Sequence, residues 1–195
     1  MTPDPVPPRP PRADARRNRE RVLDAARTVV AEQGTQASLR EIARHAGVGL
    51  GTLYRHFPTR DALLEALLGR GFDDLAAKAR TLAETRPPEE ALAEWLRDFL
   101  AGSTAYRGLA ASMMATLDDE TSPLYTSCQG MREAVAHLLE RAQKSGHVRP
   151  EVDRVDLLAL VSAIGWLADQ APSLADRRDH LFTLVMAGIT TGPPG

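Results

Sequence analysis

The sequence has little of what stabilises small secreted or metal-dependent proteins. Its 195 residues include a single cysteine, Cys128, so no internal disulfide can form. Its cysteine and histidines lack the spacing of zinc ligands, and we expect no metal and no cofactor. A chain of this length can bury about 70% of its unfolded surface, which is enough for an ordinary apolar core. We interpret Cys128 as a small buried hydrophobe, with a redox-sensing thiol as the alternative.

Long hydrophobic runs are also missing. The longest uncharged apolar segment, residues 157–168, is too short to cross a hydrocarbon layer of about 30 Å. The first twenty residues are rich in proline and arginine and lack the apolar stretch of an export signal. We therefore expect a cytoplasmic protein in which residues 157–168 form a core helix.

Catalytic motifs are equally scarce. The sequence has no P-loop, no Rossmann fingerprint and no Ser/His/Asp arrangement. Its one carboxylate cluster, residues 118–120, has no histidine or lysine nearby and is interpreted as a solvated loop. His137, His147 and His180 are too far apart in sequence to suggest a common site. We therefore expect no catalytic residues and no enzymatic activity.

Charge is distributed unevenly along the chain. The net charge is −2, but residues 1–60 contain eleven arginines against six acidic residues, which leaves the remainder at −7. Only Lys78 and Lys144 are lysines, so part of the arginine content reflects a preference for arginine over lysine along the whole sequence. The placement of the arginines still favours a nucleic-acid-binding module joined to an acidic body.

Residues 38–57, SLREIARHAGVGLGTLYRHF, have the pattern of two short helices joined by a glycine turn. Ser38 is placed to cap the first helix, and Glu41 would complete a capping box. Gly47 stands where the chain must reverse, which favours a left-handed backbone conformation. The pattern indicates a helix-turn-helix, although a plain helical hairpin would show it as well.

The second helix of this pair has two different faces. Leu53 and Phe57 are four residues apart, so they are expected to anchor its inner face to the core. The outward face carries small or polar residues able to contact phosphates or base edges: Gly51, Thr52, Tyr54, Arg55 and His56. Such a surface suits a DNA groove.

The residues that follow, FPTRDALL at 57–64, close the motif and begin another helix. The run from Ser38 to Leu64 resembles the DNA-binding signature of TetR-family transcriptional repressors, with a capped helix, an AGV turn, a GTLYxHF recognition helix and an FPxKxxLL exit. The resemblance covers roughly residues 19–68, and the remainder is similar only in length and helical character. It implies an all-α fold of about nine helices, with an N-terminal helix-turn-helix domain before a helical ligand-binding and dimerisation domain.

The resemblance also implies which residues contact DNA. Phosphate contacts are expected from Ser38, Arg40, Tyr54, His56 and Arg60. Base edges are expected to be contacted by Leu50, Gly51, Thr52 and Arg55, with Arg55 reaching guanine and Leu50 or Thr52 touching a thymine methyl. The sequence departs from the family where Gly49 and Leu50 replace serine and a polar residue, and where Arg60 replaces the usual lysine. Arg60 keeps the cation and adds a bidentate fork for phosphate.

We divide the chain into three segments. Residues 1–14 are expected to form a disordered, basic, proline-rich arm, residues 15–60 the DNA-binding domain, and residues 61–195 the effector-binding and dimerisation domain. Arginines of the arm region, including Arg17, could reach the minor groove or flanking phosphates, or the arm could be only a solvated linker.

Helical periodicity predicts the remaining elements. A helix should run from Asn18 to Gly34, and Thr59 should cap another that contains Gly69 and Gly71. These two glycines mark either a close helix crossing, which we favour, or a bend. Further helices are expected near residues 89–105, 109–117, 122–145, 153–171 and 177–190, with Pro172 ending the fourth of these and no strand between them.

The last two of these helices carry broad apolar stripes with small residues that would allow close helix packing. We expect a homodimer through Leu158, Ala159, Ser162, Ala163, Trp166, Leu181, Leu184, Val185 and Ile189, with an ordinary monomer core as the alternative. The resemblance adds that such repressors dimerise through their last two helices, which places two recognition helices on symmetric half-sites.

The middle helices contain aromatic and sulfur-containing residues that could line an apolar cavity, although each is also compatible with plain core packing. The candidate ligand-binding residues are Trp95, Phe99, Tyr106, Met113, Met114, Tyr125, Cys128 and Met131. The resemblance implies a small-molecule effector in this domain.

Together these features predict a sequence-specific transcriptional regulator. We expect a repressor that leaves a (pseudo)palindromic operator when a small, largely apolar ligand binds. An activator with the same DNA module is an alternative, because repression depends on where the operator lies. A small helical enzyme or lipophilic carrier is a more remote one.

Overall fold

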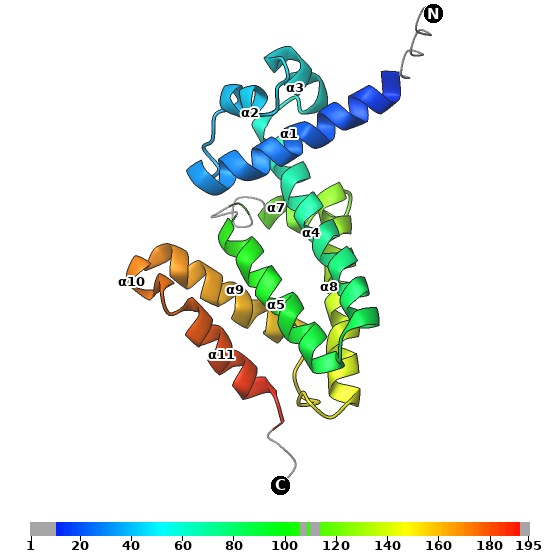
Figure 1. Ribbon diagram of the computed structural model, residues 1–195, viewed down its shortest axis with the longest axis vertical. Coiled ribbons are helices and arrows are strands. Elements are labelled where there is room, and N and C mark those ends of the chain that lie inside the picture. Colours follow the sequence, from blue (N-terminus) through cyan, green and yellow to red (C-terminus); the bar gives the residue numbers. More distant parts are fainter. Residues whose placement is uncertain (1–10, 106–108, 110–113, 192–195) are drawn as a thin grey trace, which may run out of the picture. The chain divides into compact units, whose positions relative to one another are not determined.

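The computed structural model describes residues 11–105, 109 and 114–191, and these residues form an all-α protein without a strand, as predicted (Figure 1). The helices are α1 (Pro11–Gln33), α2 (Leu39–His45), α3 (Leu50–His56), α4 (Arg60–Thr85), α5 (Pro88–Ala105), α7 (Met114–Leu117), α8 (Pro123–Lys144), α9 (Arg154–Gln170), α10 (Pro172–Ala175) and α11 (Arg178–Ile189). No helix of the described ranges is long and apolar enough to span a membrane.

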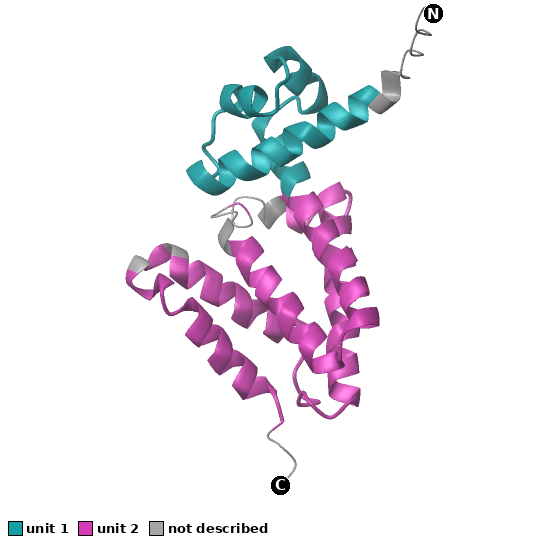
Figure 2. Ribbon diagram, viewed as in Figure 1, with its two compact units in different colours: residues 1–67 teal, residues 68–195 magenta. Residues whose placement is uncertain are grey.

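The chain divides into two compact units, residues 1–67 and 68–195 (Figure 2). The division falls inside α4, seven residues beyond the boundary that the sequence suggested after Arg60. The first turns of α4 therefore belong to the unit that contains α2 and α3. The reason is burial, because Leu63, Leu64 and Leu67 near the start of α4 are part of the core.

Helix α1 supplies the long apolar face of unit 1. Its buried residues recur at helical spacing and include Val22, Ala26, Val29 and Val30. The helix begins at Pro11, seven residues earlier than predicted, because proline fits the first position of a helix, where its missing N–H removes no hydrogen bond. The last residues of the predicted arm thus belong to α1, and residues 1–10 lie outside the described part of the chain.

Three helix starts agree with the sequence, and one capping arrangement does not. Thr59 Oγ1 accepts a hydrogen bond from the Ala62 N–H (3.0 Å) and Ser122 Oγ one from the Tyr125 N–H (3.1 Å). The Asp153 carboxylate caps α9 in the same way. The predicted capping box at α2 is wrong. Within this described segment the Ser38 side chain accepts no hydrogen bond from the start of the helix, and Glu41 Oε1 lies 3.7 Å from Arg44 Nη2 instead.

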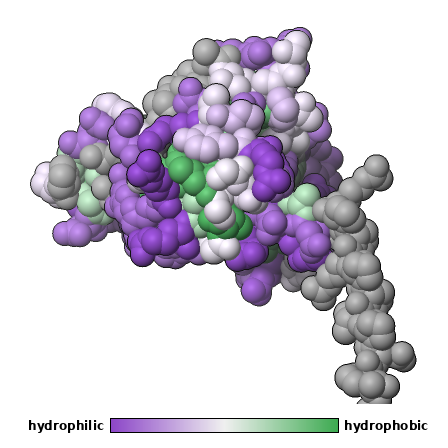
Figure 3. Space-filling model, turned by 90° about the horizontal axis from the view of Figure 1, so that it is seen from above, coloured by the Kyte–Doolittle hydropathy of each residue, from purple (hydrophilic) through white to green (hydrophobic). Residues whose placement is uncertain are grey.

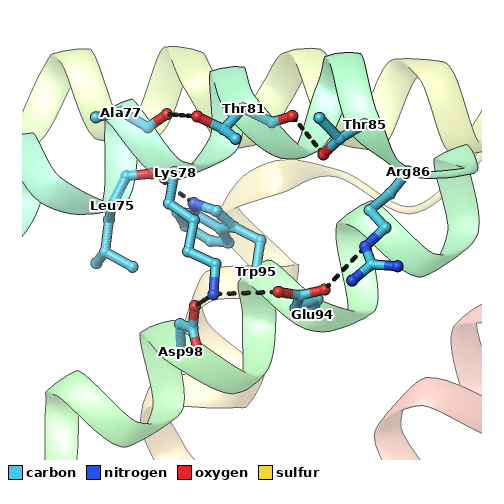
Figure 4. Close-up of polar contacts among 9 residues, drawn as sticks. All are labelled: Leu75, Ala77, Lys78, Thr81, Thr85, Arg86, Glu94, Trp95 and Asp98. Atoms are coloured by element: carbon cyan, nitrogen blue, oxygen red, sulfur yellow. Dashed lines mark hydrogen bonds and ion pairs between the residues drawn. The ribbon is translucent and has the colours of Figure 1, made fainter.

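Helices α4 and α5 of unit 2 are joined by polar contacts over a buried aromatic residue (Figure 4). The Trp95 indole N–H donates to the Leu75 carbonyl (2.8 Å). Beside it, Lys78 of α4 pairs with Asp98 and with Glu94 (3.2 Å) of α5, and Arg86 lies 3.6 Å from Glu94. These contacts fix the rotation of α5 against α4, while their exposure limits the stability that they add.

Helix α4 continues through both of its glycines without a break. A Cβ at Gly69 would be 3.6 Å from Ser127 Oγ of α8, which is van der Waals distance. A small side chain would therefore fit at Gly69, and the choice between a close crossing and a bend stays a prediction.

The C-terminal part of unit 2 departs from the sequence-based expectation in two places. Helix α9 ends at Gln170, just before Pro172, as predicted, but Pro172 also begins a short helix, α10, that was not predicted. The chain after α11 then returns to the loop before α9, where Val148 and Thr190 form an isolated antiparallel bridge. Of the helix expected at 109–117, the described portion is Leu109 together with α7.

Candidate nucleic-acid interface

The turn between α2 and α3 has the geometry that its glycine suggested. Gly47 has φ +62°, in the left-handed region, and the Val48 N–H donates to the Ala43 carbonyl (3.0 Å). Arg21 of α1 donates to the Gly47 carbonyl (3.2 Å), and a Cβ at Gly47 would be only 2.7 Å from that guanidinium nitrogen. The backbone angle therefore favours glycine here, whereas the end of the flexible Arg21 side chain could move aside for a larger residue.

The inner face of α3 is fixed by burial, as predicted. Leu53 is completely buried and Phe57 nearly so, and both belong to the core that includes Ile42 of α2. The Arg19 guanidinium of α1 lies 5.3 Å from the centre of the Phe57 ring, which is a cation–π distance. Helix α3 is thus fixed by Leu53 on its inner face and by Phe57 at its C-terminal end.

The outer face of α3 is open. Tyr54 is 45% exposed, Arg55 is exposed, and a Cβ at Gly51 would meet nothing within 4 Å. Figure 3 shows a largely hydrophilic surface around a small hydrophobic area on this side of the molecule. The predicted outward orientation of Tyr54 and Arg55 is therefore confirmed, whereas their contacts with DNA stay predictions. Thr52, His56 and Leu50 are half-buried at the edge of this surface.

Arg55 is held against its own helix. Its Nη2 donates to Thr52 Oγ1 (2.8 Å), and its Nε is 3.4 Å from the Gly51 carbonyl oxygen that it faces. The guanidinium that we expect to meet a base is thus oriented before any DNA is bound.

The residues expected to contact phosphates differ in whether their side chains already have partners within the protein. Ser38 and Arg40 are exposed. Arg60 donates from Nη1 to the Thr35 carbonyl (2.7 Å), so it also ties the start of α4 to the loop after α1. Arg17 is exposed and paired with Asp14 one turn away, and that pair must open for Arg17 to reach a phosphate.

Arg19 and Arg21 hold the helix-turn-helix in place, and sequence reasoning did not single them out. Both lie on α1, outside the helix-turn-helix, and each contacts a residue more than twenty positions away. Helical periodicity predicts only that they avoid the buried stripe of α1. Their partners follow from how α1 crosses α2 and α3, which no local sequence signal gives.

The outward face of α9 contains most of the predicted dimer residues. Ala159, Ser162, Ala163 and Trp166 are exposed, and Trp166 is 63% exposed. Leu158 of α9 is half-buried. On α11, Leu184 is 55% exposed, while Leu181 and Val185 are half-buried. Ile189 differs from the expectation, because it is buried within the protomer and its carbonyl accepts from the Arg149 N–H (3.0 Å). Ile189 thus belongs to the core of the protomer rather than to its exposed surface.

The candidate ligand residues lie on α5 and α8 where they are described. Trp95 is fully buried and stacks on Phe99, with ring centres 5.6 Å apart. Cys128 and Met131 are buried and Tyr125 is half-buried. Tyr106, Met113 and the side chain of Met114 lie outside the described residues.

Two details narrow the roles of these residues. The Trp95 N–H already has an acceptor, so a ligand there would meet only its apolar ring. Burial raises the pKa of the Cys128 thiol, which disfavours the reactive thiolate that a redox sensor needs. The predicted burial of Cys128 is therefore confirmed.

Helix α3 follows a glycine turn, exposes an arginine and packs against α1. This arrangement defines a helix-turn-helix DNA-binding protein. Residues 22–67 match the model of the tetR family of bacterial regulatory proteins, and residues 87–191 match the C-terminal domain of SbtR-like transcriptional regulators. The chain belongs to the TetR family of transcriptional regulators. The second match extends the relationship over the helical body, where the sequence alone indicated only similar length and helix content.

Individual relatives agree with this assignment. The chain is 29% identical to the regulator UidR of Escherichia coli K12, covering 83% of this chain and 86% of that one. It is 30% identical to the repressor KstR2 of Rhodococcus jostii, with 77% of each covered. It is similar to the crystal structure of the TetR regulator SCO0520 from Streptomyces coelicolor, with a TM-score of 0.73, 35% identity, and coverage of 90% and 99%.

Proposed function

We propose that this TetR-family regulator is a repressor that binds its operator through α3 and leaves it when a small, largely apolar ligand occupies unit 2. The observation that supports DNA binding best is the outer face of α3, which is open, polar and rigidly anchored by Leu53 and Phe57. The repressor reading is supported by relatives such as KstR2 of Rhodococcus jostii. We find no observation that favours an activator over it.

A dimer supplies the two recognition helices that a palindromic operator needs. Four of the five large exposed hydrophobic side chains of the described residues lie on α9 and α11: Val155, Leu160, Trp166 and Leu184. Soluble monomers rarely leave such residues concentrated on one part of their surface. A second copy packed on this face buries them and gives the assembly two α3 helices, the number that two half-sites about 34 Å apart require.

The proposed ligand acts by linkage. An effector changes DNA affinity only through a difference in its own affinity for the DNA-bound and released forms. A preference of about 3 kcal/mol for the released form weakens operator binding about 150-fold. The apolar character of Trp95, Phe99 and Met131 favours a largely apolar compound.

The test is operator binding measured by fluorescence anisotropy. Duplexes tiled across the DNA upstream of the gene are compared with scrambled duplexes of the same composition. We expect one region to bind at least 1,000-fold more tightly than the scrambled DNA. For a dimer that neutralises eight phosphates, the slope of log affinity against log salt should be about −7. Equal affinity for all duplexes, or a flat salt response, contradicts the proposal.

Transcript levels separate repression from activation. If the protein represses, deletion of its gene raises transcription from the promoter that contains the operator. A fall in the same transcript assigns it as an activator and leaves the DNA-binding mode unchanged. A thermal-shift screen of apolar metabolites, followed by anisotropy with each stabilising compound, then tests whether ligand binding releases the operator.

A further inference from the structure

We propose that Thr52 is a positioning residue for Arg55, and that the pair, rather than Thr52 by itself, determines the preference for guanine in the operator. The inference rests on the proposed DNA-binding role of α3. It replaces the expectation that Thr52 contacts a thymine methyl. Its basis is the set of hydrogen bonds that Arg55 makes on the surface of its own helix.

The two residues are placed together by helix geometry. Thr52 and Arg55 are three positions apart and Gly51 and Arg55 four, so all three lie on the outward face of α3. Arg55 Nη2 donates to Thr52 Oγ1 (2.8 Å), and Arg55 Nε faces the Gly51 carbonyl (3.4 Å). Gly51 has no side chain that could come between them.

These bonds leave one edge of the guanidinium for DNA. Arginine has five N–H donors, and the two on the Nε side are directed at Gly51 and Thr52. The remaining donors, on Nη1 and Nη2, form the end of the fork. Guanine presents O6 and N7 side by side in the major groove, which matches a two-donor edge of this kind. The hydroxyl of Thr52 therefore selects the edge that Arg55 presents.

Holding the side chain in this way also reduces the cost of binding. A free arginine on a helix surface samples many rotamers, and ordering it on DNA costs conformational free energy. An acceptor that holds the guanidinium beforehand removes part of that cost for the base that fits the presented edge. The effect is on discrimination between bases, because phosphate attraction needs no particular edge.

The experiment combines two replacements of Thr52 with one of Arg55. Thr52→Val keeps the branched shape and the methyl group but replaces the hydroxyl with a second methyl, whereas Thr52→Ser keeps the hydroxyl and removes the methyl. Each is measured alone and together with Arg55→Ala, by anisotropy, on the operator, on a scrambled duplex and on operators in which each guanine of the half-site is replaced in turn. Thermal unfolding followed by circular dichroism shows that each variant folds.

We expect Thr52→Val to reduce discrimination at one guanine by about tenfold, as loss of part of a bidentate contact should. That guanine is the one whose replacement no longer matters in Arg55→Ala. Thr52→Ser should discriminate as the wild type does. In the Arg55→Ala background Thr52→Val should have no further effect, and neither Thr52 replacement should change the affinity for scrambled DNA.

Three results overturn the positioning role. If Thr52→Ser loses discrimination and Thr52→Val keeps it, Thr52 contacts a methyl group directly. If Thr52→Val weakens binding to every duplex equally, the hydroxyl contacts a phosphate. If the effects of Thr52→Val and Arg55→Ala are additive, the two residues act independently. A wild-type protein without operator preference overturns the proposed function as well, whereas a selective wild type with an unaltered Thr52→Val variant overturns only this inference.

Discussion

The outward faces of the two units differ in the partner that they suit. In unit 1 the surface around α3 is polar, and among the described residues Tyr54 is the one large exposed hydrophobic side chain of that unit. In unit 2 the corresponding side chains gather on α9 and α11. A polar, arginine-bearing face can follow a hydrated, negatively charged groove, whereas an apolar face gains most from burial against a second protein surface. The difference separates DNA recognition from assembly.

Both units use arginine to support the fold. In unit 1, Arg19, Arg21 and Arg60 each stabilise the fold through an aromatic ring or a backbone carbonyl. Their charge adds to the basic surface, but part of their hydrogen-bonding capacity is already used. In unit 2, the Arg97 guanidinium lies 5.3 Å from the centre of the Phe182 ring, and Arg86, which follows α4, pairs with Glu94 of α5. The number of arginines in unit 1 therefore overstates the number of separate DNA contacts.

The largest expected effect tests whether the two units unfold separately. Leu53→Ala removes a completely buried side chain of α3 and should cost about 3 kcal/mol of unfolding free energy. Both tryptophans lie in unit 2, so their fluorescence reports that unit. In urea titrations we expect operator binding and part of the circular dichroism signal to be lost early, with an unchanged fluorescence midpoint.

Leu92→Ala on α5 is the matched control, because Leu92 is equally buried but in unit 2. It should shift the fluorescence midpoint by a similar free energy. If both substitutions shift both signals alike, the chain unfolds as one cooperative body and the separation of the units is only geometric.

Trp166→Ala tests the apolar face of unit 2. Trp166 is largely exposed in the protomer, so its truncation should leave protomer stability nearly unchanged. At the centre of a dimer contact it should weaken dimerisation by about 2 kcal/mol, or roughly 30-fold. Sedimentation velocity over a concentration series measures this, with Glu133→Ala on α8 as an exposed control. An unchanged dimer would show that assembly uses another surface.

The glycine of α9 is expected to be needed for packing. A Cβ at Gly165 would overlap Ser103 Oγ of α5, whose hydroxyl donates to the Leu100 carbonyl (2.8 Å). Gly165→Ala should therefore destabilise unit 2 by about 1–2 kcal/mol, even though alanine is the better helix former. Urea unfolding followed by fluorescence provides the value, and an increase in stability would show that Ser103 moves aside without cost.

Replacing Gly51 of α3 should have the opposite effect on stability to replacing Gly165. Gly51→Ala adds a methyl group in open space, so unfolding free energy should stay equal or rise by up to about 0.5 kcal/mol. If DNA approaches the α3 backbone closely, the same methyl group should weaken operator binding by about tenfold, a typical cost of one altered base contact. Anisotropy and thermal unfolding of one preparation measure both. Unchanged operator affinity would place Gly51 away from the bases.

The smallest effect concerns the ion pairs of Figure 4. The hydrogen bond to Asp98 raises the pKa of Lys78 above its ordinary value of 10.5. Because the folded-state pKa is the higher one, this stabilisation is complete below pH 10.5 and is lost as the pH rises through the folded value. Lys78→Met should therefore cost about 0.5 kcal/mol at pH 7 and almost nothing in 1 M salt. A cost that is independent of salt would assign Lys78 a packing role.

Much of unit 1 could be predicted because its signals are local. The turn at Gly47, the anchor residues Leu53 and Phe57 and the Thr59 cap each depend on residues within four positions, and all were found. The capping box at Ser38 failed because Glu41 has a competing partner one turn on, in Arg44. The contacts of Arg19 and Arg21 depend on the crossing of helices, which periodicity does not determine.

In unit 2 the helices could be predicted but the orientation of individual residues only in part. Ala159, Ser162 and Ala163 of α9 were correctly expected on an outward stripe, whereas Ile189, expected on the same kind of stripe, is buried. The reason is that the chain after α11 folds back onto the loop at Val148, a contact between residues more than forty positions apart. Leu160, which is exposed, was not singled out by the sequence at all.

The central claim, that the outward face of α3 contacts bases in the major groove, is tested most directly by methylation interference on the upstream DNA. Methylation of guanine N7 blocks one of the two acceptors that arginine would use. We predict interference at symmetric guanines in two half-sites one helical turn or a multiple apart, with one guanine of each half-site no longer sensitive in Arg55→Ala. Specific binding without interference at any guanine, or an identical pattern in the variant, would contradict the account.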